Sequence, residues 1–123
     1  MAYKMAGIND PGKEISLAEI SEYYSYQELL WSEGLGLCGK GAGGKLIDSG
    51  ATQLKGRMPI NPSGGLLSGV PLHVAGLSRV SEAAIQLKGK ADKRQVDDAR
   101  TAVAHGTCGA SGQMQCVIVL GKD

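Results

Sequence analysis

The segment at residues 114–121, MQCVIVLG, is apolar at consecutive positions rather than at alternate ones. A strand with one covered face alternates apolar and polar residues, whereas continuous apolar character is typical of a strand covered on both faces. Residues 101–105 (TAVAH) read as a second strand, and residues 14–21 (EISLAEIS) alternate imperfectly and predict a third. We therefore expect the strand at residues 114–121 to be covered on both faces.

A long helix is predicted after the glycine-rich bend at residues 61–69. Pro71 suits a first helical turn, and Gly89 suits the C-terminal cap. Between them one face is apolar at three- and four-residue steps, and the opposite face is polar. The apolar face consists of Val74, Leu77, Val80, Ala84 and Leu87, and the polar face carries Arg79, Glu82 and Gln86.

Two shorter helices are predicted nearer the start of the chain. In residues 25–34 (SYQELLWSEG), Ser25 and Glu28 have the spacing of a capping box. Residues 2–7 (AYKMAG) look like the end of a helix that Gly7 terminates, with no N-cap before it, which hints that an upstream part is missing.

The remaining segments are predicted to be loops. Residues 35–60 are rich in glycine and proline, with brief extended pieces expected around residues 45–47. Residues 88–100 are highly charged and predict a solvated connector. The chain has 19 glycines and no phenylalanine, and so much glycine indicates close backbone approaches or positive φ angles.

Length and charge exclude several classes of protein. A chain of 123 residues is enough for one compact core, so we expect one domain. Its net charge of +1 comes from scattered charges of both signs, which argues against nucleic acid and membrane surfaces as partners. The apolar runs are far shorter than the roughly 20 residues of a membrane span, and no signal peptide opens the chain. The 3 cysteines lack C-x-x-C spacing, which favours a reducing cytoplasm over a disulfide framework.

A glycine motif at residues 39–45, GKGAGGK, satisfies parts of two nucleotide-binding patterns. A phosphate loop needs a hydroxyl after its lysine, and here Leu46 follows Lys45. A dinucleotide fingerprint follows a strand and opens a helix, whereas this motif follows the predicted helix at 25–34. We therefore interpret the motif as a glycine loop.

Several residues could supply chemistry. His73 lies in the predicted first turn of the long helix, where the dipole favours a neutral imidazole that could accept a proton. His105 ends a strand and enters GTCGASG, where Cys108 and backbone N–H groups could form a thiolate beside an oxyanion pocket. Tyr23 and Tyr24 lie at a strand-to-helix corner, where one ring could face a cleft. For each residue alone a packing or surface role is the commoner alternative, and no metal site is predicted.

Taken together, these motifs resemble the C-terminal half of thiolase-superfamily proteins, most closely the sterol-carrier-type and archaeal branch. The resemblance covers nearly the whole chain in order, through AGI, LAEI, LLWSEGLGLCGKGAGG, NPSGGLLSG, QLKG, RQVDDAR and the final glycine loop. It implies that residues 1–123 are a thiolase-like C-terminal domain of the α/β class with a mixed five-stranded sheet and flanking helices. It also implies an N-terminal half outside this chain, a homo- or hetero-oligomer, and an acyl-CoA thioester as substrate with no further cofactor.

The resemblance implies a site as well. In thiolases NPSGG leads to a G-H-P turn whose histidine polarises the thioester oxygen, so Gly65, Gly69, His73 and Gly109 are implied to bind substrate. This chain has Val70 at the position of that histidine, and valine can neither donate a hydrogen bond nor move a proton.

The implied catalytic groups are Tyr23, His105 and Cys108. Tyr23 stands where sterol-carrier-type members have the cysteine of H-D-C-F, and a phenol is a poorer base than a thiolate near neutral pH. Cys108 lies close to the C-x-G cysteine of another branch. The cysteine that accepts the acyl group belongs to the other half.

Three functions remain open on this reading. The chain could complete a thiolase-like acyltransferase, or an aldol-type lyase that uses tyrosine, when it is joined to an N-terminal half. It could be a catalytically silent scaffold or binding module. It could also be an acyl-CoA carrier without turnover.

Overall fold

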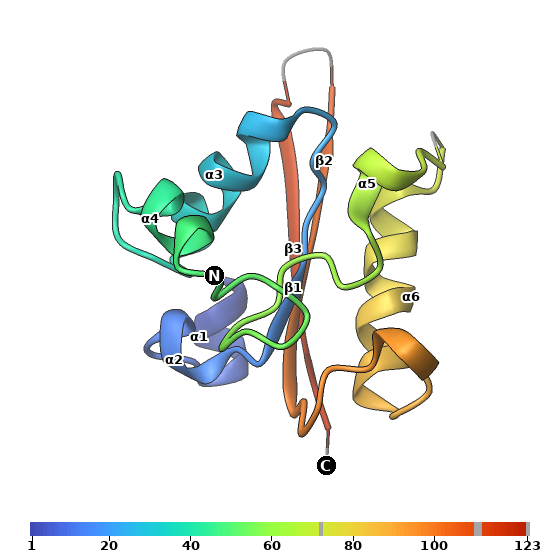
Figure 1. The fold of residues 1–123 in the computed structure, drawn as a ribbon. Coiled ribbons are helices and arrows are strands. Elements are labelled where there is room, and N and C mark those ends of the chain that lie inside the picture. Colours follow the sequence, from blue (N-terminus) through green and yellow to red (C-terminus); the bar gives the residue numbers. More distant parts are fainter. Residues whose placement is uncertain (72, 110–111, 123) are drawn as a thin grey trace.

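The computed structural model describes residues 1–71, 73–109 and 112–122, and its centre is a three-stranded sheet in the order β1-β2-β3 (Figure 1). The strands are β1 (Leu17–Glu19), β2 (Thr101–Cys108) and β3 (Met114–Gly121). β1 runs parallel to β2, whereas β3 runs antiparallel to β2 along its whole length. The three predicted strands are thus present, with β1 shorter than expected.

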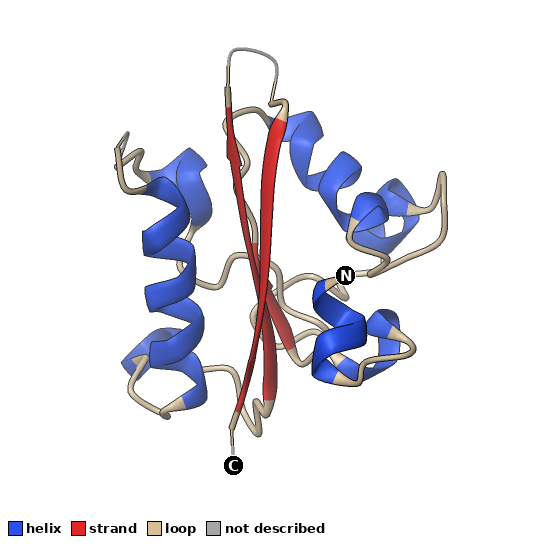
Figure 2. Cartoon of the chain, turned by 180° about the vertical axis from the view of Figure 1, so that it is seen from behind, coloured by secondary structure: helices blue, strands red, loops and turns tan. Residues whose placement is uncertain are grey.

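Helices lie on both faces of this sheet, as the α/β prediction requires. Figures 1 and 2 show α1 to α4 on one side of the sheet and α5 and α6 on the other. Their bounds are α1 (Ala2–Ala6), α2 (Pro11–Glu14), α3 (Ser25–Gly34), α4 (Gly43–Asp48), α5 (Gly65–Ser68), α6 (Ala75–Leu87) and a short 3-10 helix, η1 (Asp92–Arg94). Within the described part of the chain, no helix has the length and apolar character of a membrane span.

Two apolar clusters, one on each face, hold the layers together. Alternate residues of β2 point in opposite directions, so Val103 packs toward the α1–α4 side and Ala102 toward α6. The first cluster contains Ile20, Leu37 and Met58, and the second contains Leu17, Ala83 and Leu87. β2 is the central strand of the sheet, and its residues 102–104 contribute to the apolar clusters on both faces.

The sheet has three strands, not the five that the resemblance implied. The only further pairing among the described residues is a single parallel bridge between Ala18 and Ile60. The pieces expected to be extended around 45–47 instead form α4, so that part of the prediction was wrong. In the helix the N–H of Leu46 donates to the carbonyl of Ala42 at 2.9 Å. A single extended strand with no neighbouring strand would leave such backbone groups without partners, which favours the helix.

β3 departs from the expectation that both of its faces are covered. It is the edge strand of the sheet, and Met114, Cys116 and Ile118 are exposed. Val117 and Val119 on its other face are half-buried against the first cluster. The strand is apolar throughout, but this chain alone supplies partners for little more than one of its faces.

The helix at 25–34 is confirmed, but its cap differs from the prediction. Ser25 is already the first helical residue, so it cannot serve as the N-cap. Instead the Gln27 side chain accepts the N–H groups of Tyr23 and Tyr24, at 2.6 and 3.2 Å. This arrangement fixes the corner between β1 and α3.

The long helix begins later than predicted, at Ala75 instead of Pro71. Before it, a turn is closed by the N–H of Val74, which donates to the carbonyl of Pro71 at 2.7 Å. The predicted end is confirmed, since Gly89 has φ +67° and its N–H donates to the Gln86 carbonyl.

The buried face of α6 matches the predicted apolar face only in part, because Val80 and Leu87 pack in the second cluster but Val74 and Leu77 do not. Arg79, Glu82 and Gln86 point inward and are buried, whereas Leu77 is 65% exposed. Polar side chains can face inward here because each has partners, and Gln86 alone binds the carbonyl of Arg94 and the N–H of Val96. These bonds join α6 to the charged connector at residues 88–100, in which Val96 is buried. Apolar side chains on the other side of the helix are exposed.

Candidate active site

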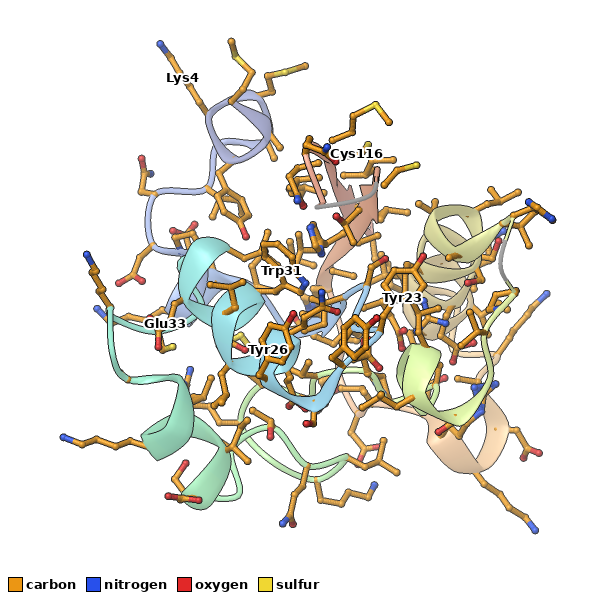
Figure 3. The ribbon with its side chains drawn as sticks, turned by 90° about the horizontal axis from the view of Figure 1, so that it is seen from above. Lys4, Tyr23, Tyr26, Trp31, Glu33 and Cys116 are labelled. Carbon is orange, nitrogen blue, oxygen red and sulfur yellow. The ribbon has the colours of Figure 1, made fainter. Side chains whose placement is uncertain are left out.

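A cavity of about 750 Å³ lies between the start of α3, the turn before α6, the C-terminal end of β2 and the N-terminal end of β3. Viewed from above, Tyr26 and Trp31 project from α3, and Tyr23 lies on the side of that helix nearer α5 and α6 (Figure 3). A volume of this size is typical of pockets that bind small molecules, which range over roughly 300–1,000 Å³.

Four of the residues predicted from the sequence line this one cavity. Tyr23 comes from the corner after β1, His73 from the turn before α6, and Cys108 and Gly109 from the end of β2. Three segments that are distant in sequence thus meet at the same end of the sheet. Gly65, Gly69 and His105 are not among the described residues that line it.

His105 lies behind the cavity wall and is 2% exposed. Its Nδ1 accepts the N–H of Ser21 at 3.4 Å, and its Nε2 lies 2.6 Å from Oε1 of Gln115. Because Nδ1 accepts, Nε2 carries the proton and donates to Gln115. Burial lowers the pKa of His105, and the bond to Gln115 partly counteracts this, so the ring is neutral near pH 7. In this arrangement His105 orients Gln115.

Gln115 was missed by the sequence analysis although it lines the cavity. Its Nε2 donates to Oγ1 of Thr107 at 3.1 Å and to the carbonyl of Gly112. The register of the β2–β3 pair could have identified this residue, because it places Gln115 directly opposite Thr107. The side chain therefore links buried His105 to the surface of the cavity.

Glycines shape the cavity at two places where a side chain would not fit. Gly109 has φ +93°, and a Cβ there would collide with the Gln113 side chain. A Cβ on Gly106 would lie 3.3 Å from Cα of Gly76, so this pair lets the start of α6 approach β2 closely. Both Gly76 and Gly106 line the cavity.

The turn at residues 61–65 (NPSGG) is fixed to the end of β1. Oδ1 of Asn61 accepts the N–H of Ile20 at 2.7 Å, and Glu19 accepts the N–H and the hydroxyl of Ser63 at 3.0 and 2.7 Å. Gly65 has φ +66°, and a Cβ on it would overlap the carboxylate of Glu22. A glycine is therefore required at this first residue of α5, where the helix packs against Glu22.

Gly69 has a different environment. It is exposed and extended, with φ −177°, and no atom lies within 4 Å of the position that its Cβ would occupy. Any side chain could adopt this backbone conformation.

A buried ion pair joins the turn, β1 and α6. Nη1 of Arg79 lies 2.7 Å from Oε2 of Glu19 and 2.9 Å from Oγ of Ser63. Burial raises the pKa of Glu19 to about 7, although Ser63 and Arg79 both favour the ionised form. Burial likewise raises the pKa of Glu22, whose Oε2 has no hydrogen-bond partner among the described residues. Both acids lie directly behind the corner that carries Tyr23.

The comparisons with known proteins agree with this architecture. The sequence model of the family described as thiolase C-terminal domain-like matches residues 1–122. The chain belongs to this thiolase family. The chain is 40% identical over 112 residues to an acetyl-CoA acetyltransferase of Methanothermobacter thermautotrophicus, covering 90% of this chain and 29% of that protein. It is 43% identical over 104 residues to sterol carrier protein 2 of Oryctolagus cuniculus, covering 84% of this chain and 19% of that protein.

A solved structure shares the fold of this thiolase domain. The structure titled Ltp2-ChsH2(DUF35) aldolase superposes with a TM-score of 0.84 and 25% identity, over 99% of this chain and 30% of that one. The chain spans less than a third of the length of these relatives. Its likeness is therefore to one part of each larger protein.

The thiolase domain shows where two unusual residues lie. Val70, which the sequence resemblance places at the histidine of the G-H-P turn, is 47% exposed and is not among the described residues that line the cavity. Tyr23, which the resemblance places at the sterol-carrier cysteine, does line it, and no described residue hydrogen-bonds its hydroxyl. The predicted catalytic and binding roles of all seven residues stay predictions.

Proposed function

We propose that this thiolase C-terminal domain, residues 1–123, completes an enzyme that forms or breaks carbon–carbon bonds of acyl-CoA thioesters together with an N-terminal thiolase half. The observation that carries the proposal is the convergence of Tyr23, His73, Cys108 and Gly109 on one cavity. Relatives named for acetyl-CoA chemistry match most of the chain. No cofactor beyond the thioester is proposed, and a reducing cytoplasm stays the predicted setting for its three free thiols.

The residues have distinct roles in this proposal. The Tyr23 hydroxyl moves the proton at the reacting carbon, and the glycine segment at Gly109 lets the thioester approach the main chain. Cys108 and His73 lie on the remaining walls as further acid–base groups. The acyl-accepting cysteine comes from the N-terminal half, so the isolated chain is inactive.

Two exposed surfaces support a partner half. α6 presents an apolar stripe that includes Val74 and Leu77, and the edge strand β3 exposes Met114 and Ile118. Apolar surface of this kind on a sheet edge marks an interaction site. We propose that the N-terminal half, within a homo- or hetero-oligomer, covers these surfaces.

The test is thiolysis of acetoacetyl-CoA by the chain alone and by the chain joined to its N-terminal half. The proposal expects turnover only from the joined protein. Robust turnover by the chain alone would contradict the proposal that the N-terminal half supplies the acyl-accepting cysteine. A joined protein that binds acetoacetyl-CoA without turnover would favour a silent scaffold or a carrier. A ligand at a hundred times its Kd stabilises a protein by about 2.7 kcal/mol, so a thermal shift with acetyl-CoA detects such a carrier.

A second candidate function is an aldol-type lyase that acts on 3-hydroxyacyl-CoA. Tyr23 in place of a cysteine and Val70 in place of a histidine favour it, and the solved relative is titled an aldolase. In that reaction the base removes the hydroxyl proton and the bond between C2 and C3 breaks, which gives an aldehyde or ketone and a shorter acyl-CoA. The lyase needs no free CoA, whereas thiolysis consumes one CoA per turn, so omitting CoA from the assay distinguishes the two reactions.

A further inference from the structure

Two exposed aromatic rings stand side by side at the mouth of the cavity. Tyr24 is 62% exposed and Tyr26 is 58% exposed, and both line the cavity. Their ring centroids are 5.9 Å apart and their planes differ by 8°. Neither ring belongs to the two apolar clusters of the core. The core of the fold therefore makes no use of these rings, which stack on one another at the surface.

The backbone that carries the two rings is fixed at the start of α3. Tyr24 is the N-cap of α3 and Tyr26 lies in the first turn, so one ring is set beside the other by the helix start. Gln27 fixes that corner through the N–H groups of Tyr23 and Tyr24. A preorganised aromatic surface loses little conformational entropy when a ligand stacks on it.

Other walls of the cavity leave room for a bulky group. Gly76, Gly106, Gly109 and Gly112 contribute no side chains there. The space of about 750 Å³ lies within the range of pockets that hold small molecules, so a bulky group fits there. Offset-parallel aromatic groups attract one another beyond simple burial, so a flat ring is the chemical group that this surface would favour.

We propose that Tyr24 and Tyr26 form a stacking platform for a planar ring carried by the thioester substrate. The ring belongs either to the acyl group or to the adenine of coenzyme A, and both present the same flat surface. The proposal rests on the proposed function, because it assigns a preference to the same cavity. Tyr24 and Tyr26 act as specificity-determining residues and take no part in proton transfer.

The test uses the chain joined to its N-terminal half and four substrates. These are a phenyl-substituted 3-oxoacyl thioester and a straight-chain one of equal carbon number, each as the coenzyme A and as the pantetheine thioester. Two ratios of kcat/KM are measured. The acyl ratio divides the value for the ring-bearing substrate by that for the straight-chain one, and the coenzyme A ratio divides the value for the coenzyme A thioester by that for the pantetheine thioester. The variants are Tyr24→Leu and Tyr26→Leu, which remove the ring, and Tyr24→Phe and Tyr26→Phe, which keep it.

The platform predicts that one ratio falls about 3- to 10-fold in the leucine variants and is rescued in the phenylalanine variants. A fall in the acyl ratio assigns the acyl ring, and a fall in the coenzyme A ratio assigns adenine. Unchanged ratios, or phenylalanine variants that behave like leucine variants, would overturn the proposal. Turnover of the straight-chain substrates by the unmodified protein shows separately that the proposed function stands. If no thioester is turned over, equilibrium dialysis with the same four compounds measures the same two ratios as affinities.

Discussion

Tyr23 lines the cavity at the corner between β1 and α3, and its hydroxyl has no hydrogen-bond partner among the described residues. Cys38 lies away from the cavity lining, half-buried against the first apolar cluster, and burial raises the pKa of its thiol. The two residues therefore form a matched pair for testing chemistry against packing.

Tyr23→Phe removes only the hydroxyl, so we expect it to lower kcat of the joined protein by about 10²- to 10⁴-fold, the range of a lost acid–base group. Cys38→Ser should change kcat less than about twofold, because a substitution remote from the cavity acts only through stability. Steady-state kinetics of both variants measures the difference. Equal losses would leave no reason to assign the chemistry to Tyr23.

The raised pKa of Glu19 makes the free energy of unfolding depend on pH. Burial raises its pKa from 4.5 to about 7, so between these values the folded chain holds a proton that the unfolded chain has released. The free energy of unfolding should therefore fall as the pH rises from about 5 to 7, by up to about 3 kcal/mol. Glu19→Gln keeps the neutral shape and cannot titrate.

Urea unfolding of the two proteins across this pH range isolates the effect. Subtracting the curve of Glu19→Gln from that of the unmodified chain removes the contributions of Glu22 and His105. The subtracted stability should fall with rising pH, and a flat or rising difference would contradict the assignment.

Sequence reasoning found some residues of the site and missed others for a physical reason. Tyr23, His73 and Cys108 carry their chemistry in their own side chains, so a motif can point to them. Arg79 acts through Glu19, 60 residues away in the chain, and only the folded sheet brings the two together. Because Arg79 lies on the polar side of the α6 pattern, we expected its side chain to be exposed. That prediction was wrong, because hydrogen bonds to buried polar partners offset the free-energy cost of burying the guanidinium group.

At the scale of elements, α6 and β3 could be predicted because their apolar patterns extend over eight or more residues, whereas β2 was predicted only over residues 101–105 and extends to Cys108. α4 could not, because two glycines open it and lower its helical propensity. The start of α6 was misplaced because Pro71 suits both a helix start and the turn that is present.

The crossing of α6 over β2 depends on the contact between Gly76 and Gly106. Gly106→Ala should force these elements apart and lower the free energy of unfolding by about 1–3 kcal/mol. Gly44→Ala is the matched control, because Gly44 is exposed in α4 and a Cβ there meets nothing within 4 Å. That change should stabilise the chain by about 0.5–1 kcal/mol. Chemical denaturation compares the two, and similar effects of the same sign would show that the crossing does not require glycine.

At the scale of the whole molecule, the thiolase family could be recognised from the order of short motifs, but the number of strands could not. The described sheet has three strands, and β3 remains an open edge. The continuous apolar run in β3 correctly indicated a strand, yet the described residues leave Met114 and Ile118 on its second face exposed. In our proposal the N-terminal half covers this face and the exposed stripe on α6.

Leu77→Asp tests that explanation. Leu77 is largely exposed, so the change should alter the free energy of unfolding by less than about 0.5 kcal/mol. It should weaken association with a separately produced N-terminal half by at least about tenfold, since a charge would be buried in an apolar interface. Met5→Asp, at an 81% exposed position of α1 on the other side of the sheet, makes the same change in charge and is the control. Isothermal titration that gives equal affinities for both variants would place the interface elsewhere.

The most direct measurement of the central claim is alkylation of the three thiols by iodoacetamide in the joined protein, followed by mass spectrometry of the peptides. Cys108 and Cys116 line the cavity, and Cys38 does not. A thioether analogue of acetyl-CoA that cannot be cleaved should slow the labelling of Cys108 and Cys116 and leave Cys38 unchanged. Labelling of Cys108 at the same rate with and without a saturating amount of the analogue would contradict the placement of the thioester in this cavity.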